Sequence, residues 1–138
     1  MSEKKYYLAK TDPETYTIEK FKADKCTTWD GVSNPQAVAA IKHMTIGDRV
    51  LIYHSGGETS IRGVARVISK PKPDLKNPKS WVVDLEFLEA FKPPYITLKQ
   101  IKETKKFNDF TLVYQSRLST MEVPETFIRW LKKQGLAL

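Results

Sequence analysis

The sequence predicts an α+β fold, a mixed or antiparallel β-barrel of about five to six strands with short helices around it. Apolar segments with the two-residue period of strands alternate along the chain with short segments of helical period. The segments between strands are too short for a doubly wound parallel sheet, in which each strand–helix–strand unit needs about 30 residues or more. The length of 138 residues and the apolar content of 41% fit one domain over residues 1–138.

Two short elements are expected near the start of the chain. Residues 6–9, Tyr-Tyr-Leu-Ala, are apolar and rich in aromatic rings, which predicts a first strand. Thr17 is a favourable N-cap, so a short helix is expected from there to about residue 22. Ile18 and Phe21 are three residues apart, on the buried side of that helix.

A longer helix and an interior strand follow. Asn34-Pro35 predicts a helix start, because asparagine caps free amides and proline suits the first helical position. The next apolar residues recur at helical spacing: Ala37, Ala40, Ile41 and Met44. Residues 49–54 contain the run Val-Leu-Ile-Tyr, which is apolar on both faces, as expected of an interior strand.

The middle of the chain predicts a paired strand and a basic loop. After a turn at residues 55–58, a strand is expected at about residues 61–69, where Gly63 indicates a bulge or a close ligand. Residues 70–79 are expected to form a semi-extended loop, because their prolines cannot supply ladder donors. The same loop holds four lysines, which make it a basic strip: Lys70, Lys72, Lys76 and Lys79.

The last third of the chain predicts two strands and two helices. Residues 81–87 alternate between apolar and acidic side chains, as in a half-buried strand, and the break at Phe87-Leu88 indicates a bulge or the strand end. Thr97 predicts the start of a short helix. Residues 110–114 are expected to form another strand, and Pro124 opens the last helix.

The charge balance favours a polyanionic partner. Lysine and arginine number 23 against 16 acidic residues, a formal net charge of +7 with neutral histidines. This surface suits nucleic acid, a phosphate-bearing ligand or an anionic membrane surface; alternatively, the lysines only keep a small domain in solution. A single cysteine excludes an internal disulfide and a multi-cysteine zinc site. We expect a soluble, cytoplasmic protein, because no secretory signal and no apolar run of about 18 residues occur.

Motifs for catalysis or cofactor binding are not found in the sequence. The chain has no glycine-rich phosphate loop and no G-x-S-x-G nucleophile motif. His43 and His54 lack partners at metal-ligand spacing, so neither a metal nor a cofactor is expected. Cys26 with His54 could form a nucleophile pair, and Asp30 or Asp84 could act as acid or base, but lone residues of these types are weak evidence for catalysis.

Residues 29–37 combine a large aromatic ring, a carboxylate, a glycine and a helix N-cap. We expect Trp29 to lie in a loop, where its ring is available to stack on a planar ligand. Asp30 and Asn34 carry groups that could read the polar edge of that ligand. The alternative is that Trp29 fills the core and Asn34 only caps the helix, and spacing alone does not separate the two interpretations.

Five sequence blocks extend this pattern over nearly the whole chain. They are Tyr-Leu-Ala-Lys-Thr-Asp-Pro-Glu at 7–14, Thr-Thr-Trp-Asp-Gly-Val-x-Asn-x-x-Ala at 27–37, Met-x-x-Gly-Asp-x-Val-x-x-Tyr-His-Ser at 44–55, Gly-x-Ala-x-Val at 63–67, and Ser-Arg-Leu-Ser at 116–119. In this order they resemble the EVE domain family of the PUA-like superfamily. They are more distantly similar to the YTH readers of methylated adenine.

The resemblance implies a PUA-like fold and a pocket that holds one extruded base, with methylated cytosine among the candidate bases. By position, Trp29 would be the stacking wall, and the rest of the pocket would be Lys10, Thr11, Asp30, Asn34, Tyr53, His54, Ser55, Ser116, Arg117 and Ser119. The region between Gly63 and Trp81 is shorter here than in several relatives. The segment left to meet the nucleic-acid backbone is therefore the strip with Lys70, Lys72, Lys76 and Lys79.

The hypothesis favoured by these observations is a non-catalytic module that binds DNA or RNA through a modified base, with no membrane partner. A second hypothesis is a small enzyme acting on a nucleotide or base, with Asp30 or His54 as its acid or base. A third is a protein-interaction module with an incidental basic surface, because the 18 lysines outnumber the 5 arginines and lysine favours solvated charge.

Overall fold

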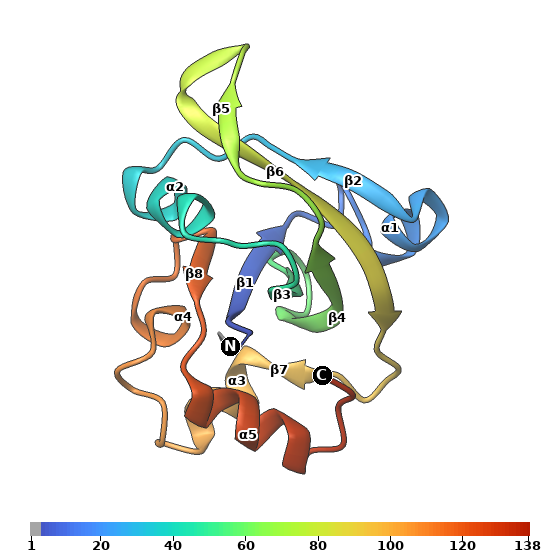
Figure 1. The fold of residues 1–138 in the computed structure, drawn as a ribbon. Helices are drawn as coiled ribbons and strands as arrows, with labels where there is room; N and C mark the ends of the chain where they lie inside the picture. The colour runs from blue at the N-terminus through green and yellow to red at the C-terminus, as the bar shows by residue number, and fades with distance from the viewer. Residues whose placement is uncertain (1–3) are drawn as a thin grey trace.

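One mixed sheet organises the molecule, a computed structural model that describes residues 4–138 (Figure 1). Its strands are ordered β2-β6-β4-β3-β1-β8, with β5 paired to β6 and β7 paired to β4. The bounds are β1 Tyr6–Thr11, β2 Cys26–Trp29, β3 Arg49–His54, β4 Ser60–Val67, β5 Lys72–Asp74, β6 Asn77–Ala90, β7 Ile96–Thr97 and β8 Thr120–Glu122. β1 and β3 are parallel and the other pairs are antiparallel. The sheet forms a half-barrel with short helices, which confirms the predicted fold class.

Residues 4–138 form five helices, α1 Ile18–Asp24, α2 Pro35–Lys42, α3 Leu98–Glu103, α4 Thr111–Tyr114 and α5 Glu125–Lys133. Three of them, α1, α2 and α3, begin where the sequence predicts a capping residue. Thr17 Oγ1 accepts the Lys20 amide at 3.1 Å, and Thr97 Oγ1 accepts the Gln100 amide at 3.1 Å. Each cap satisfies an amide that has no partner within the first helical turn. The predicted starts of these two helices are thus confirmed.

Two segments after residue 69 differ from the prediction. Residues 110–114 were expected as a strand, but 111–114 form the short helix α4, because Leu112 is buried by a helical turn rather than by a ladder. Residues 70–79 were expected as a loop, but β5 pairs with the start of β6 and makes a hairpin. The prolines at 71, 73 and 78 shorten this pairing without preventing it.

Gly63 is required by close packing within the sheet. A Cβ at this position would lie 2.6 Å from the Glu89 carbonyl oxygen and 2.6 Å from Ile18 Cδ1. The β3–β4 register also shifts beside it, between Ile52 and Tyr53. The expected bulge is therefore present next to this glycine, and the space where its side chain would lie is filled by β6 and α1.

The break expected at Phe87-Leu88 is a bulge within β6. Val64 pairs with Glu89 and Ala65 pairs with Phe87, so Leu88 is the extra residue. The strand continues beyond it to Ala90. Of the two interpretations left open by the sequence, the bulge is correct.

Candidate functional site

A cavity of about 430 Å³ opens where β1 and β2 end and β8 begins, and we call it the Trp29 cavity. It is lined by side chains from separate parts of the chain: Lys10, Thr11, Asp12, Thr15, Tyr16, Thr27, Thr28, Trp29, Asp30, Gly31, Val32 and Ser119. Its volume is in the range of sites for small organic ligands. Five of the residues predicted for the pocket line it: Lys10, Thr11, Trp29, Asp30 and Ser119.

Trp29 is the last residue of β2, not a loop residue as expected. It pairs with Val83 of β6 at the end of a strand that contains two threonines. Its side chain is only 8% exposed, with Tyr16 at 6.4 Å edge-on and Phe21 at 6.3 Å between ring centroids. The β-branched threonines and the ladder to β6 hold this segment extended. The indole is thus fixed by packing and still forms part of the cavity wall.

Asp30 and Gly31 turn the chain away from the sheet after Trp29. Gly31 has φ +77°, a left-handed conformation that glycine adopts at little cost. Asp30 is exposed and borders the cavity, and within residues 4–138 no ion pair occupies its carboxylate. A free acceptor therefore lies next to the aromatic wall.

Lys10 brings the one ammonium group among the residues that line the Trp29 cavity. Its Nζ donates to the Ser116 carbonyl oxygen at 2.9 Å and lies 5.7 Å from the centre of the Tyr53 ring. Burial lowers the pKa of this ammonium. The contact with Ser116 leaves donor capacity, because an ammonium has three N–H bonds.

The remaining wall is rich in hydroxyl groups. Thr11 Oγ1 donates to the Tyr16 carbonyl oxygen at 2.8 Å, and the Tyr16 hydroxyl donates to Asp24 Oδ2 at 2.8 Å. Burial, and then this bond to Asp24, raises the pKa of Tyr16. Sequence reasoning missed Thr15, Tyr16, Thr27 and Thr28, although the last two immediately precede Trp29.

Three predicted residues line a smaller neighbouring cavity of about 280 Å³ instead. Its walls are Asn34, Gln36, Gln115, Ser116, Arg117 and Leu118. Asn34 Oδ1 accepts the amides of Gln36 at 2.9 Å and Ala37 at 3.2 Å, so its oxygen is used in capping α2. Segment 116–119 borders both cavities, and Arg117 is exposed at this rim.

The predicted trio at the end of β3, Tyr53, His54 and Ser55, does not line the Trp29 cavity. Tyr53 is 2% exposed and His54 is 4% exposed, and His54 Nε2 accepts the amide of Ile18 at 3.1 Å. Burial, and next the charge of Arg62, lowers the pKa of His54. Ser55 is exposed and its amide donates to the Thr11 carbonyl oxygen at 3.0 Å. His54 and Ser55 thus hold α1 and the end of β1 in place.

The four lysines predicted to meet a nucleic-acid backbone are on the β5–β6 hairpin or directly before it. All four side chains are exposed: Lys70, Lys72, Lys76 and Lys79. β6 is antiparallel to β2, so the start of β6 lies at the same end of the sheet as Trp29. The basic strip and the Trp29 cavity therefore share one end of the molecule.

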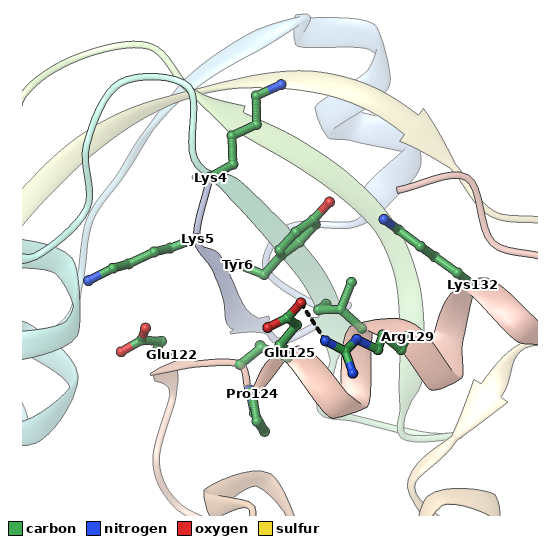
Figure 2. Close-up of a pocket in the computed structure, with 10 residues that line it drawn as sticks. Lys4, Lys5, Tyr6, Glu122, Pro124, Glu125, Arg129 and Lys132 are labelled. Atoms are coloured by element: carbon green, nitrogen blue, oxygen red, sulfur yellow. Dashed lines mark hydrogen bonds and ion pairs between the residues drawn. The ribbon is translucent and has the colours of Figure 1, made fainter. Parts of the chain in front are cut away.

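A larger cavity of about 750 Å³ lies at the other end of β1, and we call it the Tyr6 cavity. It is lined by Lys4, Lys5, Tyr6, Glu122, Val123, Pro124, Glu125, Ile128, Arg129 and Lys132. Figure 2 shows lysines extending around the Tyr6 ring and Arg129 paired with Glu125. Arg129 Nη2 and Glu125 Oε1 are 2.9 Å apart. No feature of the sequence predicts a cavity at this position.

Metal-binding and membrane-spanning features are not found in the part of the chain that the structure describes. Among residues 4–138, no three histidine, cysteine, aspartate or glutamate side chains gather as they would around a metal ion. None of the helices in that range has the length and apolar character needed to cross a bilayer.

Comparison with known proteins agrees with the fold and with the sequence blocks. The EVE domain family model matches residues 5–134. Thymocyte nuclear protein 1 from Homo sapiens and from Gallus gallus are each 29% identical in an alignment of 125 residues. The matches cover 70% of this chain and 55% and 51% of those proteins, respectively. The chain thus spans about half the length of the curated relatives it matches.

Solved structures share the architecture. A protein from Pseudomonas putida has a TM-score of 0.86 at 29% identity, covering 95% of this chain and 99% of that one. The human THYN1 protein, in complex with DNA that contains 5-methylcytosine, has a TM-score of 0.85 at 23% identity, covering 97% and 99%. At that identity the human structure shows a shared fold. Because the family model matches almost the whole chain, residues 5–134, the chain belongs to the EVE domain family.

Proposed function

We propose that this chain is a non-catalytic DNA-binding module that holds one modified base, such as a methylated cytosine, in the Trp29 cavity. The observation that carries the proposal is the cavity itself, with an indole wall between a free carboxylate and a half-buried ammonium. The human THYN1 protein, which has the same fold, is found with DNA containing 5-methylcytosine. RNA with a modified base remains a second substrate for the test below.

The polar groups of the cavity complement a cytosine edge. Cytosine offers an amino donor at N4, which a carboxylate such as Asp30 accepts. Its O2 and N3 are acceptors, which suit the Lys10 ammonium and the neighbouring threonine hydroxyls. Thymine has an acceptor where cytosine has its amino group, so Asp30 would face an unpaired oxygen. The arrangement therefore favours cytosine over thymine.

The energies indicate modest selectivity for the modification. Stacking of a base on an aromatic ring contributes about 1–3 kcal/mol, and each satisfied hydrogen bond adds about 1 kcal/mol. Extrusion of a paired base costs a few kcal/mol, so the pocket alone scarcely binds a duplex. A buried methyl contributes about 0.8 kcal/mol, which is a few-fold preference. The lysines on the hairpin would supply the remaining affinity through phosphate contacts.

The test is a fluorescence-anisotropy titration with oligonucleotides that differ only at one cytosine, unmodified or 5-methylated, as single strands and as duplexes. Wild type should prefer the methylated DNA by about three- to fivefold. Asp30→Asn should weaken binding to both DNAs by about tenfold, because the amide presents a poorer acceptor than a carboxylate. RNA of the same sequence in parallel identifies the preferred nucleic acid.

The matched control is Glu122→Gln, which neutralises an exposed carboxylate in the Tyr6 cavity. It should bind both DNAs as wild type does, or slightly more tightly. Equal losses for Asp30→Asn and Glu122→Gln, or equal wild-type affinities for every oligonucleotide, would contradict a base site at Trp29.

A further inference from the structure

The tip of the β5–β6 hairpin carries the most exposed large apolar side chain of the described residues. Leu75 is 101% exposed, as open as in an isolated extended peptide. It stands between Asp74 and Lys76, at the end of the hairpin that projects from the top of the molecule in Figure 1. Turns normally carry glycine, asparagine or other polar residues, so a leucine here has no role in turn formation.

The turn that presents Leu75 is locally ordered. The Lys76 amide donates to Asp74 Oδ1 at 2.8 Å, and the Lys79 amide donates to Asn77 Oδ1 at 3.1 Å. Such side-chain bonds to the backbone two residues ahead fix the conformation of a turn. Leu75 is therefore held outward by its neighbours on the chain and has little freedom to fold back onto the surface.

The base of the hairpin is attached to the body. Trp81 pairs with Pro73 and packs partly against the core, and Lys42 Nζ lies 4.9 Å from the centre of its indole ring. Just beyond, the Asp84 amide donates to Ser69 Oγ at 2.9 Å. These contacts fix the base of the hairpin, so its tip has a defined position relative to the sheet.

The surroundings of Leu75 suit a polyanion. Lys70, Lys72, Lys76 and Lys79 are exposed around it. Asp74 is the acidic residue of the hairpin, and its Oδ1 is used in the turn. Within residues 4–138 none of these four lysines forms an ion pair with a carboxylate. An apolar tip on a hairpin with four free ammonium groups matches the stacked bases and phosphates of nucleic acid better than a neutral apolar partner.

The tip lies at the same end of the sheet as the Trp29 cavity. Trp29 pairs with Val83, and β6 runs from there back to Asn77, a path of about 20 Å at the rise of a strand. The hairpin leaves the sheet near the Lys72–Val82 pair, so Leu75 projects about 10 Å beyond it. The grooves of duplex DNA are about 7.5–8.5 Å deep, so this projection reaches the base stack.

We propose that Leu75 inserts as an apolar wedge into the base stack of duplex DNA beside the nucleotide that enters the Trp29 cavity. This proposal rests on the proposed function. Extrusion of a base leaves a gap, and an apolar side chain in that gap recovers part of the lost stacking and slows the return of the base. Leu75 then contributes only when the target is double-stranded, whereas the surrounding lysines act on any DNA.

The experiment compares one 5-methylcytosine oligonucleotide as a duplex and as a single strand, with wild type and Leu75→Ala. The variant should lose about tenfold in affinity for the duplex and less than twofold for the single strand. In the duplex, 2-aminopurine placed beside the methylated base should brighten with wild type and brighten less with Leu75→Ala at saturation. Leu75 makes no buried contact, so the fold is expected to be unchanged.

Two control variants give the wedge a distinct signature. Lys76→Gln should weaken duplex and single-strand binding by similar factors, because a phosphate contact does not require stacking. Ile46→Ala removes another large apolar side chain, 62% exposed and not part of the hairpin, and should change neither affinity. Equal losses of Leu75→Ala on both forms, or no loss on the duplex, would overturn the wedge.

The outcome also separates this proposal from the function on which it rests. If Asp30→Asn weakens binding while Leu75→Ala has no effect, the base site stands and the wedge is wrong. If wild type binds no DNA, both are wrong. Loss of binding to vesicles of anionic phospholipid in Leu75→Ala, with duplex affinity intact, would assign the tip to a lipid surface and overturn the wedge.

Discussion

The two cavities at the ends of β1 differ in how their walls are built. The Tyr6 cavity is the larger, at about 750 Å³ against about 430 Å³. Its charged side chains are exposed, and Figure 2 shows lysines around the Tyr6 ring. The buried residues Val123 and Ile128 also line it. The Trp29 cavity instead has an aromatic ring fixed by two other rings and an ammonium held by a backbone carbonyl.

From this difference we infer that the Trp29 cavity, although smaller, is better organised to hold a planar ligand. Exposed lysines must lose rotamer freedom when they bind, whereas Trp29 and Lys10 are already held by their neighbours. A planar ligand needs a flat wall and polar groups at set positions. Of these two cavities, the Trp29 cavity has a ring and an ammonium group that are already held in place. The predictions below test this contrast.

The largest expected effect is that of Trp29→Ala. It should lower the free energy of unfolding by about 3–4 kcal/mol, because the indole is buried against Tyr16 and Phe21. It should also weaken DNA binding by about 5- to 150-fold, because the roughly 1–3 kcal/mol of stacking on the indole is lost. Urea denaturation and anisotropy titration measure the two effects.

Trp29→Phe and Tyr6→Ala are the comparison variants. Trp29→Phe should retain most of the stability and part of the affinity, which separates stacking from folding. Tyr6→Ala removes the ring of the other cavity and should leave DNA affinity unchanged. A Tyr6→Ala variant that folds and loses as much DNA affinity as Trp29→Phe would invert the ranking of the two cavities.

The next effect in size is that of Lys10→Met, which replaces the ammonium with an apolar side chain of similar length. Affinity for methylated DNA should fall about tenfold, because a hydrogen bond from a charged donor is lost. Lys132→Met, in the Tyr6 cavity, should change affinity less than twofold at 0.15 M salt, where distant exposed charges are screened. Similar losses in both variants would indicate a diffuse electrostatic effect instead of a site.

A smaller effect is expected from pH, through His54. The burial of His54 lowers its pKa in the folded protein. In mildly acidic solution the unfolded chain therefore binds a proton at His54 that the folded chain does not bind. Stability should therefore be complete above about pH 6.5 and should fall as the pH drops below it. His54 Nε2 accepts the first amide of α1, which begins two residues after Tyr16 of the Trp29 cavity.

The pH effect is measured by urea unfolding between pH 7.5 and pH 5. His54→Gln keeps an acceptor for the Ile18 amide and should remove most of the dependence in this range. His43→Gln, at an exposed ring on the C-cap of α2, should keep it. A wild-type protein equally stable at both pH values would show that His54 is not held neutral.

The sequence predicted those parts of the fold that depend on local signals. Thr17, Asn34 and Thr97 cap helices because the acceptor and the amides it satisfies are two or three residues apart. The strands β3 (Arg49–His54) and β4 (Ser60–Val67), predicted at 49–54 and at about 61–69, follow from apolar runs of sufficient length. In contrast, β2, β5, β7 and β8 have four residues or fewer, too short for a periodic signal.

What could not be predicted depends on partners that are distant in the sequence. Trp29 is placed in a strand by its pairing with Val83. His54 resembles a polar residue free at a strand end, yet its nitrogen is used by the amide of Ile18, 36 positions earlier. The sequence blocks that resemble the EVE family include both residues. They do not show that Trp29 lines the cavity, whereas His54 is buried outside its wall and binds the amide of Ile18.

The smallest effect is expected from Glu125→Gln, which removes the ion pair with Arg129 at the edge of the Tyr6 cavity. Both side chains are mostly exposed, 72% and 67%, and the pair has the helical i,i+4 spacing. Such pairs contribute about 0.3–0.5 kcal/mol, so the change in unfolding free energy should be at the limit of detection by urea denaturation. The released Arg129 should add no affinity for methylated DNA. If Glu125→Gln binds methylated DNA more tightly than wild type, and Glu125→Gln/Arg129→Gln abolishes that gain, the Tyr6 cavity also takes part in DNA binding. The two cavities at the ends of β1 would then differ less in function than their structures indicate.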